Sequence, residues 1–315
     1  MSYMIDLSKE TLVRRGINAV FRLSNFSLPR ILVTLTALIS MTMILMIFLF
    51  LAKDSLRIFM TTGINFVKGT KWDIGKDVYG ALPMIIGSIL VTTIAMLIAI
   101  PIGLGSAIFA SEILPARLRI ILKSIMELLA GIPSIVYGLM GIAILVPFIR
   151  NTFSLLTGRT VLTAGILLGI MVLPTIMTIS EDALKAVPRE YRDTALGLGL
   201  TRMEMIIHCV LPQAFPGIIG AILLGIGRAI GETMAVMLVI GGIDRLPISL
   251  VSHIFLPSQT MTSKLGREVA EASYGSLQWS ALIGLGLILF VMVIGITFAA
   301  DIILIGKGNK DAKNH

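Results

Sequence analysis

The sequence predicts an all-α integral membrane protein with six transmembrane helices. Of its 315 residues, 56% are hydrophobic and 14% are charged, whereas a soluble domain carries roughly 25% charge. The charged residues gather in short polar segments between long apolar runs. A transmembrane helix needs about 20 mostly apolar residues. The runs that meet this requirement are 31–51, 83–110, 128–149, 161–180, 213–242 and 279–305.

The first apolar run is expected to be an uncleaved membrane anchor. The segment before it, residues 1–30, is polar and charged, whereas a cleavable signal peptide places a shorter apolar core nearer the start. Cytoplasmic segments carry an excess of Lys and Arg. With the N-terminus inside, the inner segments hold 15 of these residues and the outer segments hold 10. We therefore expect two cytoplasmic ends, residues 1–30 and 306–315, around a transmembrane domain of residues 31–305.

Two local patterns refine the arrangement of the helices. Residues 118–127, just before the third run, have their charged side chains at helical spacing. This segment is expected to lie at the membrane interface before the chain enters the bilayer. Gly165 and Gly169 are four residues apart, as are Gly227 and Gly231. Small residues at this spacing are expected to let neighbouring helices pack closely.

The polar segment 181–212 begins with the signals of a short helix. Pro188 suits the first turn of a helix, because its missing N–H has no intrahelical partner there. Residues 189–198 are good helix formers, and Gly199 can adopt the left-handed conformation that caps a helix. We expect one helix between these two residues.

A second short helix is expected in the same segment. Thr201 and Glu204 have the spacing of a capping box, and the helix is expected to end at Leu211-Pro212 before the next span. A plain connector needs far fewer residues than 181–212 provides. Helix–turn–helix organisation favours a docking surface, and an incidental interfacial hairpin remains the alternative.

Arg228 and Glu232 are the only charges between Phe215 and Gly242. Placing such a residue at the centre of a membrane helix costs about 2.5–3.5 kcal/mol on insertion scales. Residues four apart share one helical face, so the two are expected to lie together near the middle of the span. Intramembrane ionisable residues mark transport pathways, which favours Arg228 as a contact for an oxyanion and Glu232 as the group that orients it. The alternative is an ion pair that only seats this helix against its neighbours.

Other classes of protein are disfavoured by what the polar segments contain. Cys209 is the only cysteine, and the three histidines have no metal-ligand spacing. Adjacent helical residues such as His208 and Cys209 cannot face one another, which argues against a nucleophilic pair. The segment Gly69–Asp77 departs from the spacing of a nucleotide-binding loop. The net charge of +8 fits cytoplasmic loops and lipid headgroups better than nucleic acid. No catalytic residue, metal or cofactor is expected on this chain.

One motif in the polar segment resembles a known family. Its spacing matches the cytoplasmic "EAA" loop of ABC importer permeases, in which E-A-A, a glycine, an isoleucine and L-P recur at fixed intervals. The matching residues are Asp193, Thr194, Ala195, Gly199, Cys209, Leu211 and Pro212. Asp193, Thr194 and Cys209 depart modestly from the family pattern. The resemblance implies a type I ABC importer permease, in which this coupling loop docks on a separate ATP-binding subunit and lies in the cytoplasm.

Three further stretches are similar to permeases of phosphate-specific importers. They are LLAGIPSIVYGL at 128–139, EDALKAVPREYR at 181–192 and GRAIGETMAVMLVIGG at 227–242. The Met-Ala-Val that follows Thr233 resembles the PstC-type subunit. This likeness implies an inner-membrane subunit that translocates inorganic phosphate, with Arg228, Glu232 and Thr233 on the substrate pathway.

The same resemblance implies the partners of the chain. They are a sister permease of the PstA type, a homodimer of ATP-binding subunits of the PstB type, and an extracytoplasmic phosphate-binding protein of the PstS type. ATP and Mg²⁺ would be bound by the ATP-binding subunits, so the chain itself would not be an enzyme. The outer segment 243–278, with Lys264, Arg267, Glu268 and Glu271, is expected to be either the landing surface for the binding protein or a solvated helix without a partner.

Two alternative functions remain. The first is a permease of the same class for another oxyanion, such as phosphonate or molybdate. The second is a self-sufficient ion-coupled carrier or channel that uses Arg228 and Glu232 for gating. The long coupling loop argues against the second, because such a carrier has no ATPase to dock.

Overall fold

The computed structural model describes the backbone of residues 3–244, 246 and 254–311, and the side chains of residues 30–244, 246 and 254–298. The described residues are mostly helical, and six helical segments are long and apolar enough to cross a membrane. The predicted fold class is confirmed. The chain divides into two compact units, Met1–Lys53 and Asp54–His315. The described part of the first unit belongs to a single helix, α1 (Tyr3–Thr62), whose apolar part runs over Arg30–Thr62.

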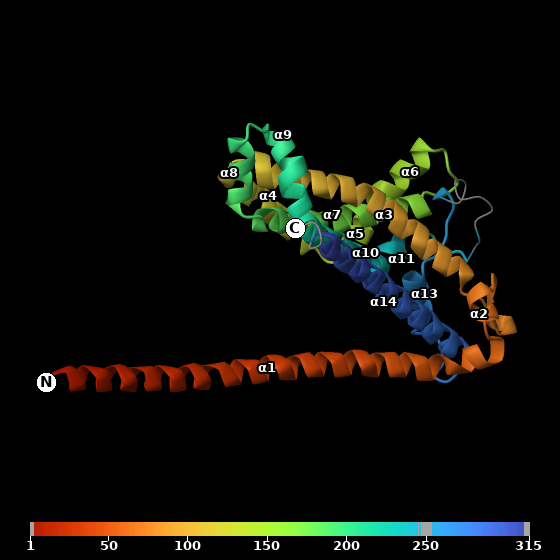
Figure 1. Cartoon of the computed structure of the whole chain (residues 1–315). Helices are drawn as coiled ribbons and strands as arrows, with labels where there is room; N and C mark the ends of the chain where they lie inside the picture. The colour runs from red at the N-terminus through yellow and green to blue at the C-terminus, as the bar shows by residue number, and fades with distance from the viewer. Residues whose placement is uncertain (1–2, 245, 247–253, 312–315) are drawn as a thin grey trace. The chain divides into compact units, whose positions relative to one another are not determined.

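The second unit holds the remaining helices and one two-stranded antiparallel sheet (Figure 1). Besides the α-helices and strands, its described residues form a 3-10 turn, η1, and three π-helical turns, η2, η3 and η4. In chain order after α1, the elements are α2 (Asn65–Lys68), β1 (Trp72–Asp73), η1 (Ile74–Lys76), β2 (Val78–Tyr79), α3 (Leu82–Ile108), η2 (Phe109–Ile113), α4 (Ala116–Ala130), α5 (Ser134–Met140), η3 (Gly141–Leu145), α6 (Val146–Thr152), α7 (Val161–Ala186), α8 (Arg189–Gly197), α9 (Arg202–Met205), η4 (Ile206–Val210), α10 (Leu211–Gly231), α11 (Met234–Val239), α13 (Met261–Glu268) and α14 (Leu277–Asp311).

The core of this unit is built on α3 and α7, which lie side by side, with α10 packed against both. Three hydrophobic clusters follow one another along α3: one at its beginning with α13 and α14, one in its middle with α7 and α11, and one at its end with α8, η4 and α10. Among the described spans α7 is the most enclosed, since 61% of its most apolar stretch is buried and at most 33% of that of any other. α7 is therefore the central helix of the unit.

Close packing at small residues is confirmed for one pair of glycines and is not seen at the other pair among the described residues. A Cβ added at Gly165 would lie 2.5 Å from Cγ2 of Ile94, and one at Gly169 would lie 3.1 Å from the carbonyl oxygen of Ala95. These two glycines let α7 approach α3. At Gly227 and Gly231 an added Cβ would meet nothing within 4 Å. Spacing alone identifies a face where close approach is possible, whereas contact requires a neighbouring helix on that face.

The third and fourth spans differ from their predicted bounds. The chain leaves α4 at Ala130, turns through Gly131–Pro133 and starts the next helix at Ser134, because Pro133 cannot continue the hydrogen-bonded ladder. The first part of the predicted run 128–149 is thus the end of the amphipathic helix α4. Helix α7 extends past its apolar run to Ala186, so the polar segment 181–212 begins inside that helix.

The fifth predicted span is two helices rather than one. Helix α10 ends at Gly231, Glu232 is extended with ψ 122°, and α11 starts at Met234. The backbone groups freed by this break are bonded by side chains. The Glu232 carboxylate accepts from the N–H of Ala235 at 3.2 Å, and the Thr262 hydroxyl donates to the Glu232 carbonyl at 2.9 Å. Such a break is tolerated in an apolar environment only where its polar groups find partners.

Candidate substrate pathway and coupling loop

Arg228 lies in the last turn of α10, where it is half-buried among three helices. Its Nη1 donates to Oγ1 of Thr175 on α7 at 2.9 Å, and its Nη2 reaches the carbonyl oxygen of Ala130 at 3.4 Å. Ala130 is the last residue of α4, and the carboxyl end of a helix carries a partial negative charge that favours a nearby cation. The side chain is thus held by neutral groups.

The expected ion pair between Arg228 and Glu232 does not form. The Glu232 carboxylate caps α11 through Ala235, and within the described part of the chain no carboxylate oxygen lies within the 4.0 Å ion-pair distance of the Arg228 guanidinium. The two residues do not share a helical face, because the helix ends between them. No carboxylate of the described residues therefore occupies the planar donor fork of Arg228.

Thr233, the third predicted pathway residue, lies in the break between α10 and α11. Its hydroxyl donates to the carbonyl oxygen of Gly231 at 3.3 Å. Helix α13 packs against this break, because a Cβ added at Gly266 would lie 2.8 Å from Cγ2 of Thr233. The break is consequently held between the end of α10 and α13.

The other face of α13 carries a buried lysine. Lys264 is 3% exposed and lies 2.6 Å from the Asp244 carboxylate and 2.5 Å from that of Glu268. Its ammonium also lies 4.8 Å from the centre of the Trp72 ring, whose Nε1 donates to Glu268 at 3.1 Å. Burial raises the pKa of Asp244, against the opposing effect of Lys264. Lys264 is thus not a solvated charge, as the solvated-helix alternative for the outer segment would have it.

Among the other predicted outer charges, Glu271 is exposed and Arg267 is half-buried. Residues 245 and 247–253 of the same segment lie outside the described residues. A cavity of about 570 Å³ opens between the β1–β2 hairpin and α13, with Lys264 and Glu268 among its lining residues. The segment Gly69–Asp77 forms part of this hairpin and not the strand–loop–helix that a nucleotide-binding loop requires.

The first helix of the coupling loop has the predicted caps. Helix α8 begins after Pro188 and ends at Gly197, and Gly199 has φ +85°. The N–H of Leu200 bonds to the carbonyl of Ala195, and that of Gly199 to the carbonyl of Leu196. These two bonds form a Schellman motif, which requires a left-handed residue at the position of Gly199.

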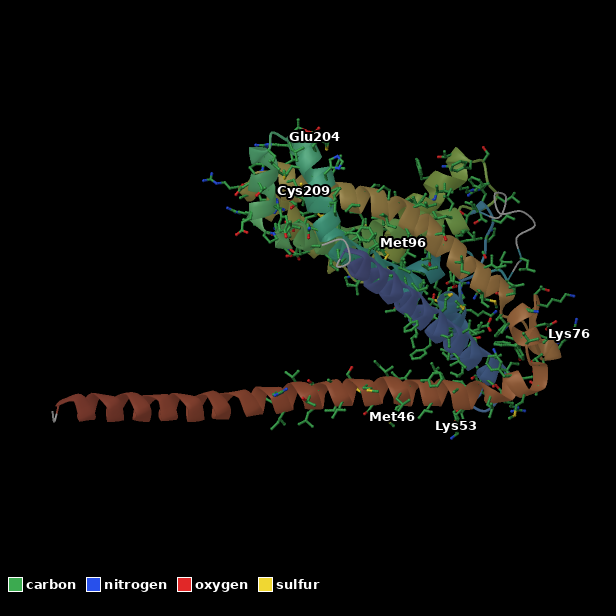
Figure 2. The ribbon with its side chains drawn as sticks, viewed as in Figure 1. Met46, Lys53, Lys76, Met96, Glu204 and Cys209 are labelled. Carbon is green, nitrogen blue, oxygen red and sulfur yellow. The ribbon has the colours of Figure 1, made fainter. Side chains whose placement is uncertain are left out.

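The second helix begins as predicted but does not end where expected. Thr201 and Glu204 form a capping box at the start of α9, and Figure 2 labels Glu204 and Cys209 on this part of the loop. The helix then widens into the π turn η4 and continues into α10 without ending at Leu211-Pro212. In η4 the Leu211 N–H bonds to the carbonyl of Ile206. A π turn changes the ladder locally, so Pro212, which has no N–H, is accommodated at the start of α10.

The predicted docking residues divide between an outer and an inner side of the loop. Asp193, Thr194 and Pro212 are exposed, and an added Cβ at Gly199 would meet nothing within 4 Å. Ala195 is 3% exposed and belongs to the cluster formed with the end of α3 and α10. The remaining member, Leu211, packs against the same cluster. The motif therefore presents some residues outward and attaches the loop to the bundle through others.

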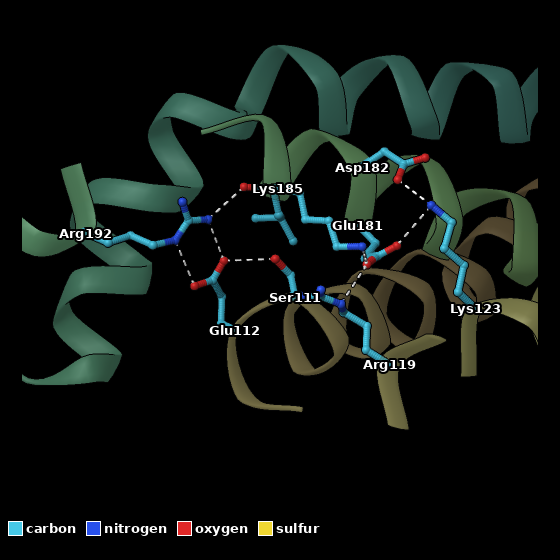
Figure 3. A network of polar contacts seen from close by, with 9 residues as sticks. Ser111, Glu112, Arg119, Lys123, Glu181, Asp182, Lys185 and Arg192 are labelled. Carbon is cyan, nitrogen blue, oxygen red and sulfur yellow. Dashed lines mark hydrogen bonds and ion pairs between the residues drawn. The ribbon is translucent and has the colours of Figure 1, made fainter. Parts of the chain in front are cut away.

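A network of charged side chains lies under the loop (Figure 3). Arg192 of α8 forms a two-pronged ion pair with Glu112 of η2, with N–O distances of 2.8 and 3.1 Å. Glu181 of α7 is fully buried, and its carboxylate pairs with cations of α4 and α7. These cations are Arg119, Lys123 and Lys185.

Lys123 also pairs with Asp182, and the hydrogen bond to that carboxylate raises the pKa of Lys123. Glu112, Glu181 and Thr175 are not predicted as functional residues from the sequence. The available signal for the two carboxylates is weak: both stand at the polar ends of apolar runs. Thr175 has no signal in an apolar helix, because a hydroxyl there commonly bonds to its own backbone.

An arginine held inside a bundle of apolar helices is typical of the membrane subunit of a transporter. The chain belongs to the family described as binding-protein-dependent transport system inner membrane component, whose profile matches residues 99–304. It is therefore a multi-pass inner-membrane protein. Members of this family associate with an ATP-binding subunit and a substrate-binding protein, and they are permease components rather than enzymes.

Individual relatives cover most of the chain. The probable ABC transporter permease protein YqgH of Bacillus subtilis is 39% identical over 268 residues, which span 84% of this chain and 85% of that protein. The phosphate transport system permease protein PstC of Mesorhizobium japonicum is 39% identical over 251 residues, spanning 74% and 75%. The protein of that name from Pasteurella multocida is 40% identical over 253 residues, spanning 74% and 77%.

The fold is shared with a solved transporter. The structure of the inward facing MetNI methionine ABC transporter superposes with a TM-score of 0.57 over 71% of this chain and 94% of the matched chain. The sequence identity is 19%, so this likeness concerns the fold alone. It confirms the type I ABC importer permease architecture.

Proposed function

We propose that this chain is one of two related membrane subunits of an ATP-driven importer, and that inorganic phosphate is its substrate. Relatives that are named as permeases of phosphate transport systems support the substrate. The single observation that carries the proposal is the state of Arg228. Its guanidinium lies inside the bundle and contacts only a hydroxyl and a carbonyl oxygen of the described residues.

The chemistry of Arg228 suits an oxyanion. A guanidinium offers several N–H donors in one plane and can bond two oxygens of one phosphate. Its present contacts are neutral, so an incoming anion would not have to displace a carboxylate. A contact at 3.4 Å with Ala130 is weak and can be exchanged for a phosphate oxygen. The Thr233 hydroxyl at the helix break supplies a further polar group on the same pathway.

Transport would depend on partners on both sides of the membrane. On the cytoplasmic side, the loop residues Asp193, Thr194 and Pro212 would contact a homodimer of PstB-type subunits, which binds ATP and Mg²⁺. Both termini of this chain would lie on that side. A PstA-type permease would complete the pore, and a PstS-type protein would deliver phosphate to the outer segment 243–278. No cofactor is assigned to this chain.

The proposal is tested by phosphate uptake into proteoliposomes that contain the complete transporter and the phosphate-binding protein. Arg228→Gln removes the charge, and we expect uptake to fall at least a hundredfold while the complex assembles normally. Arg228→Lys keeps the charge without the planar fork and should restore only part of the activity. Arg150→Gln, at an exposed position of α6, is the matched control and should transport normally.

Two further measurements separate the alternatives. Molybdate and phosphonate are added as competitors, and strong competition or direct uptake of either would assign the pore to another oxyanion. The chain is also reconstituted alone, without ATP or partners. Clear phosphate flux in that sample, or normal uptake by Arg228→Gln in the complete transporter, would refute the proposed function.

A further inference from the structure

One side chain of the loop helix α8 bonds to two of the membrane helices. Arg192 donates from Nε and Nη2 to the two oxygens of Glu112, from Nη1 to the carbonyl of Val187 at 2.6 Å, and from Nη2 to that of Leu184 at 2.8 Å. Glu112 belongs to η2 at the end of α3, and Leu184 to the end of α7. A single guanidinium therefore joins α8 to both helices of the central pair.

The Arg192–Glu112 ion pair resists separation because both side chains are largely buried. The side chain of Glu112 is 5% exposed and that of Arg192 is 17% exposed. Ser111 donates a further bond to Glu112 at 2.9 Å. Moving α8 away would leave a buried carboxylate without its cation, which costs far more than breaking an exposed pair.

A second buried carboxylate extends the same network of contacts. Glu181, which has no exposed surface, stands on α7 within ion-pair distance of Arg119 and Lys123 on α4. The hydrophobic cluster around Ala195 lies in the same region and includes residues from the ends of α3 and α7. Polar contacts connect the loop helix and the ends of α3, α4 and α7 (Figure 3), and apolar packing adds to them.

Helix α7 connects this group to the pathway arginine. Leu184, whose carbonyl accepts a hydrogen bond from Arg192, is nine residues from Thr175, or about 14 Å along a helix. Thr175 in turn accepts the hydrogen bond from Arg228. Among the described spans α7 is the most enclosed, and close packing of this kind is suited to passing a displacement along a helix.

We propose that the Arg192–Glu112 pair is the link that passes ATP-driven movement of α8 to α3 and α7, and through Thr175 to Arg228. Both members are positioning residues, since each would act through α7 and Arg228 rather than on the substrate. The inference rests on the proposed function, because it requires a transporter driven through α8. It further requires that α8 and the end of α3 move as one body.

The first test measures phosphate transported per ATP hydrolysed by the complete transporter in proteoliposomes. Glu112→Gln keeps the size of the side chain and removes the charge, and we expect this ratio to fall at least tenfold while the ATP-binding subunits remain bound. Arg192→Lys, which keeps the charge but cannot reach all the acceptors, should give an intermediate ratio and covers the case in which the first variant does not fold. Asp182→Asn, a matched loss of a carboxylate at an exposed position, should be unchanged.

The second test measures the distance between α3 and α8 directly. Spin labels are placed at Gly105→Cys and Gly197→Cys in a Cys209→Ser background, because an added Cβ meets nothing within 4 Å at either glycine. In the otherwise unchanged transporter the distance should be the same with and without ATP. In Glu112→Gln it should broaden or shift when ATP binds.

Several results would overturn the proposal. A normal transport ratio in Glu112→Gln and Arg192→Lys would remove the pair from coupling. A shift of the label distance on ATP binding in the unsubstituted pair would show that α8 moves independently of α3. Loss of the ATP-binding subunits from Glu112→Gln would assign the pair to docking instead. Absence of phosphate uptake by the parent transporter is a separate outcome and would refute the proposed function itself.

Discussion

Replacing Glu232 by Gln and by Ala distinguishes a helix cap from a counter-charge. In the structure the Glu232 carboxylate accepts from the N–H of Ala235 at 3.2 Å and does not pair with Arg228. The Gln side chain keeps a carbonyl oxygen that can accept the same bond, whereas Ala has none. If capping is the role of Glu232, only the Ala substitution should impair transport.

The size of the effect follows from the strength of a cap. Loss of a capping bond costs about 1 kcal/mol, which corresponds to a factor of about five in an equilibrium constant. For Glu232→Ala we expect the equilibrium between the observed conformation of the α10–α11 break and other conformations to shift about fivefold away from the observed one. The maximal uptake rate should fall by a similar factor. Glu232→Gln should stay within about twofold of the unchanged transporter, because it keeps an acceptor and loses only roughly half of the strength of the capping bond.

The assay is the dependence of the uptake rate on phosphate concentration in proteoliposomes. A counter-charge would give a different result: both substitutions would leave Arg228 less neutralised, and both would change the half-saturating phosphate concentration by the same large factor. Equal impairment of the Gln and Ala variants would therefore refute the capping role.

Two further predictions concern packing and charge beneath the pathway. Gly165→Ala should lower the thermal stability of the purified complex, because the added Cβ would lie 2.6 Å from Cβ of Ile94. Overpacking of this kind costs about 1–3 kcal/mol. The higher helix propensity of Ala offsets about 1 kcal/mol of this cost. Gly105→Ala, which meets open space, should be neutral or slightly stabilising, and equal thermal stabilities of the two variants would contradict this account. The pair of Lys123 and Asp182 should contribute less than about 1 kcal/mol, because Asp182 is 59% exposed. Since Asp182 raises the pKa of Lys123, the stabilisation by this pair is present below pH of about 10.4 and is lost as the pH rises through the raised pKa of Lys123. An effect of Asp182→Asn on thermal stability that persists above that pH range would contradict this prediction.

The sequence determined the features that depend on neighbours along the chain. Composition and run length establish six membrane helices, because the bilayer imposes both on any segment that crosses it. The caps of the coupling loop are equally local: the capping box needs only Thr201 and Glu204, and the Schellman motif needs a left-handed residue at Gly199. These expectations are confirmed in the structure.

The tertiary structure decided which distant groups meet. On a continuous helix Arg228 and Glu232 would be neighbours, but the helix ends between them. The break is tolerated because Thr262 and the Glu232 carboxylate bond to the backbone groups that it releases. Arg228 then meets Thr175 and Ala130, which are 53 and 98 residues away in sequence. A charge in an apolar environment takes whichever partners the packed helices bring within reach, and no local pattern encodes that choice.

The outer and inner charge networks follow the same rule. Lys264 has the spacing of a solvated helical residue, but the hairpin and Asp244 cover it, so it is buried and paired. Glu112 and Arg192 are 80 residues apart and meet only because α3 and α7 pack side by side. Helix formation and capping are local and can be read from the sequence, whereas burial and pairing depend on the positions of all the surrounding helices.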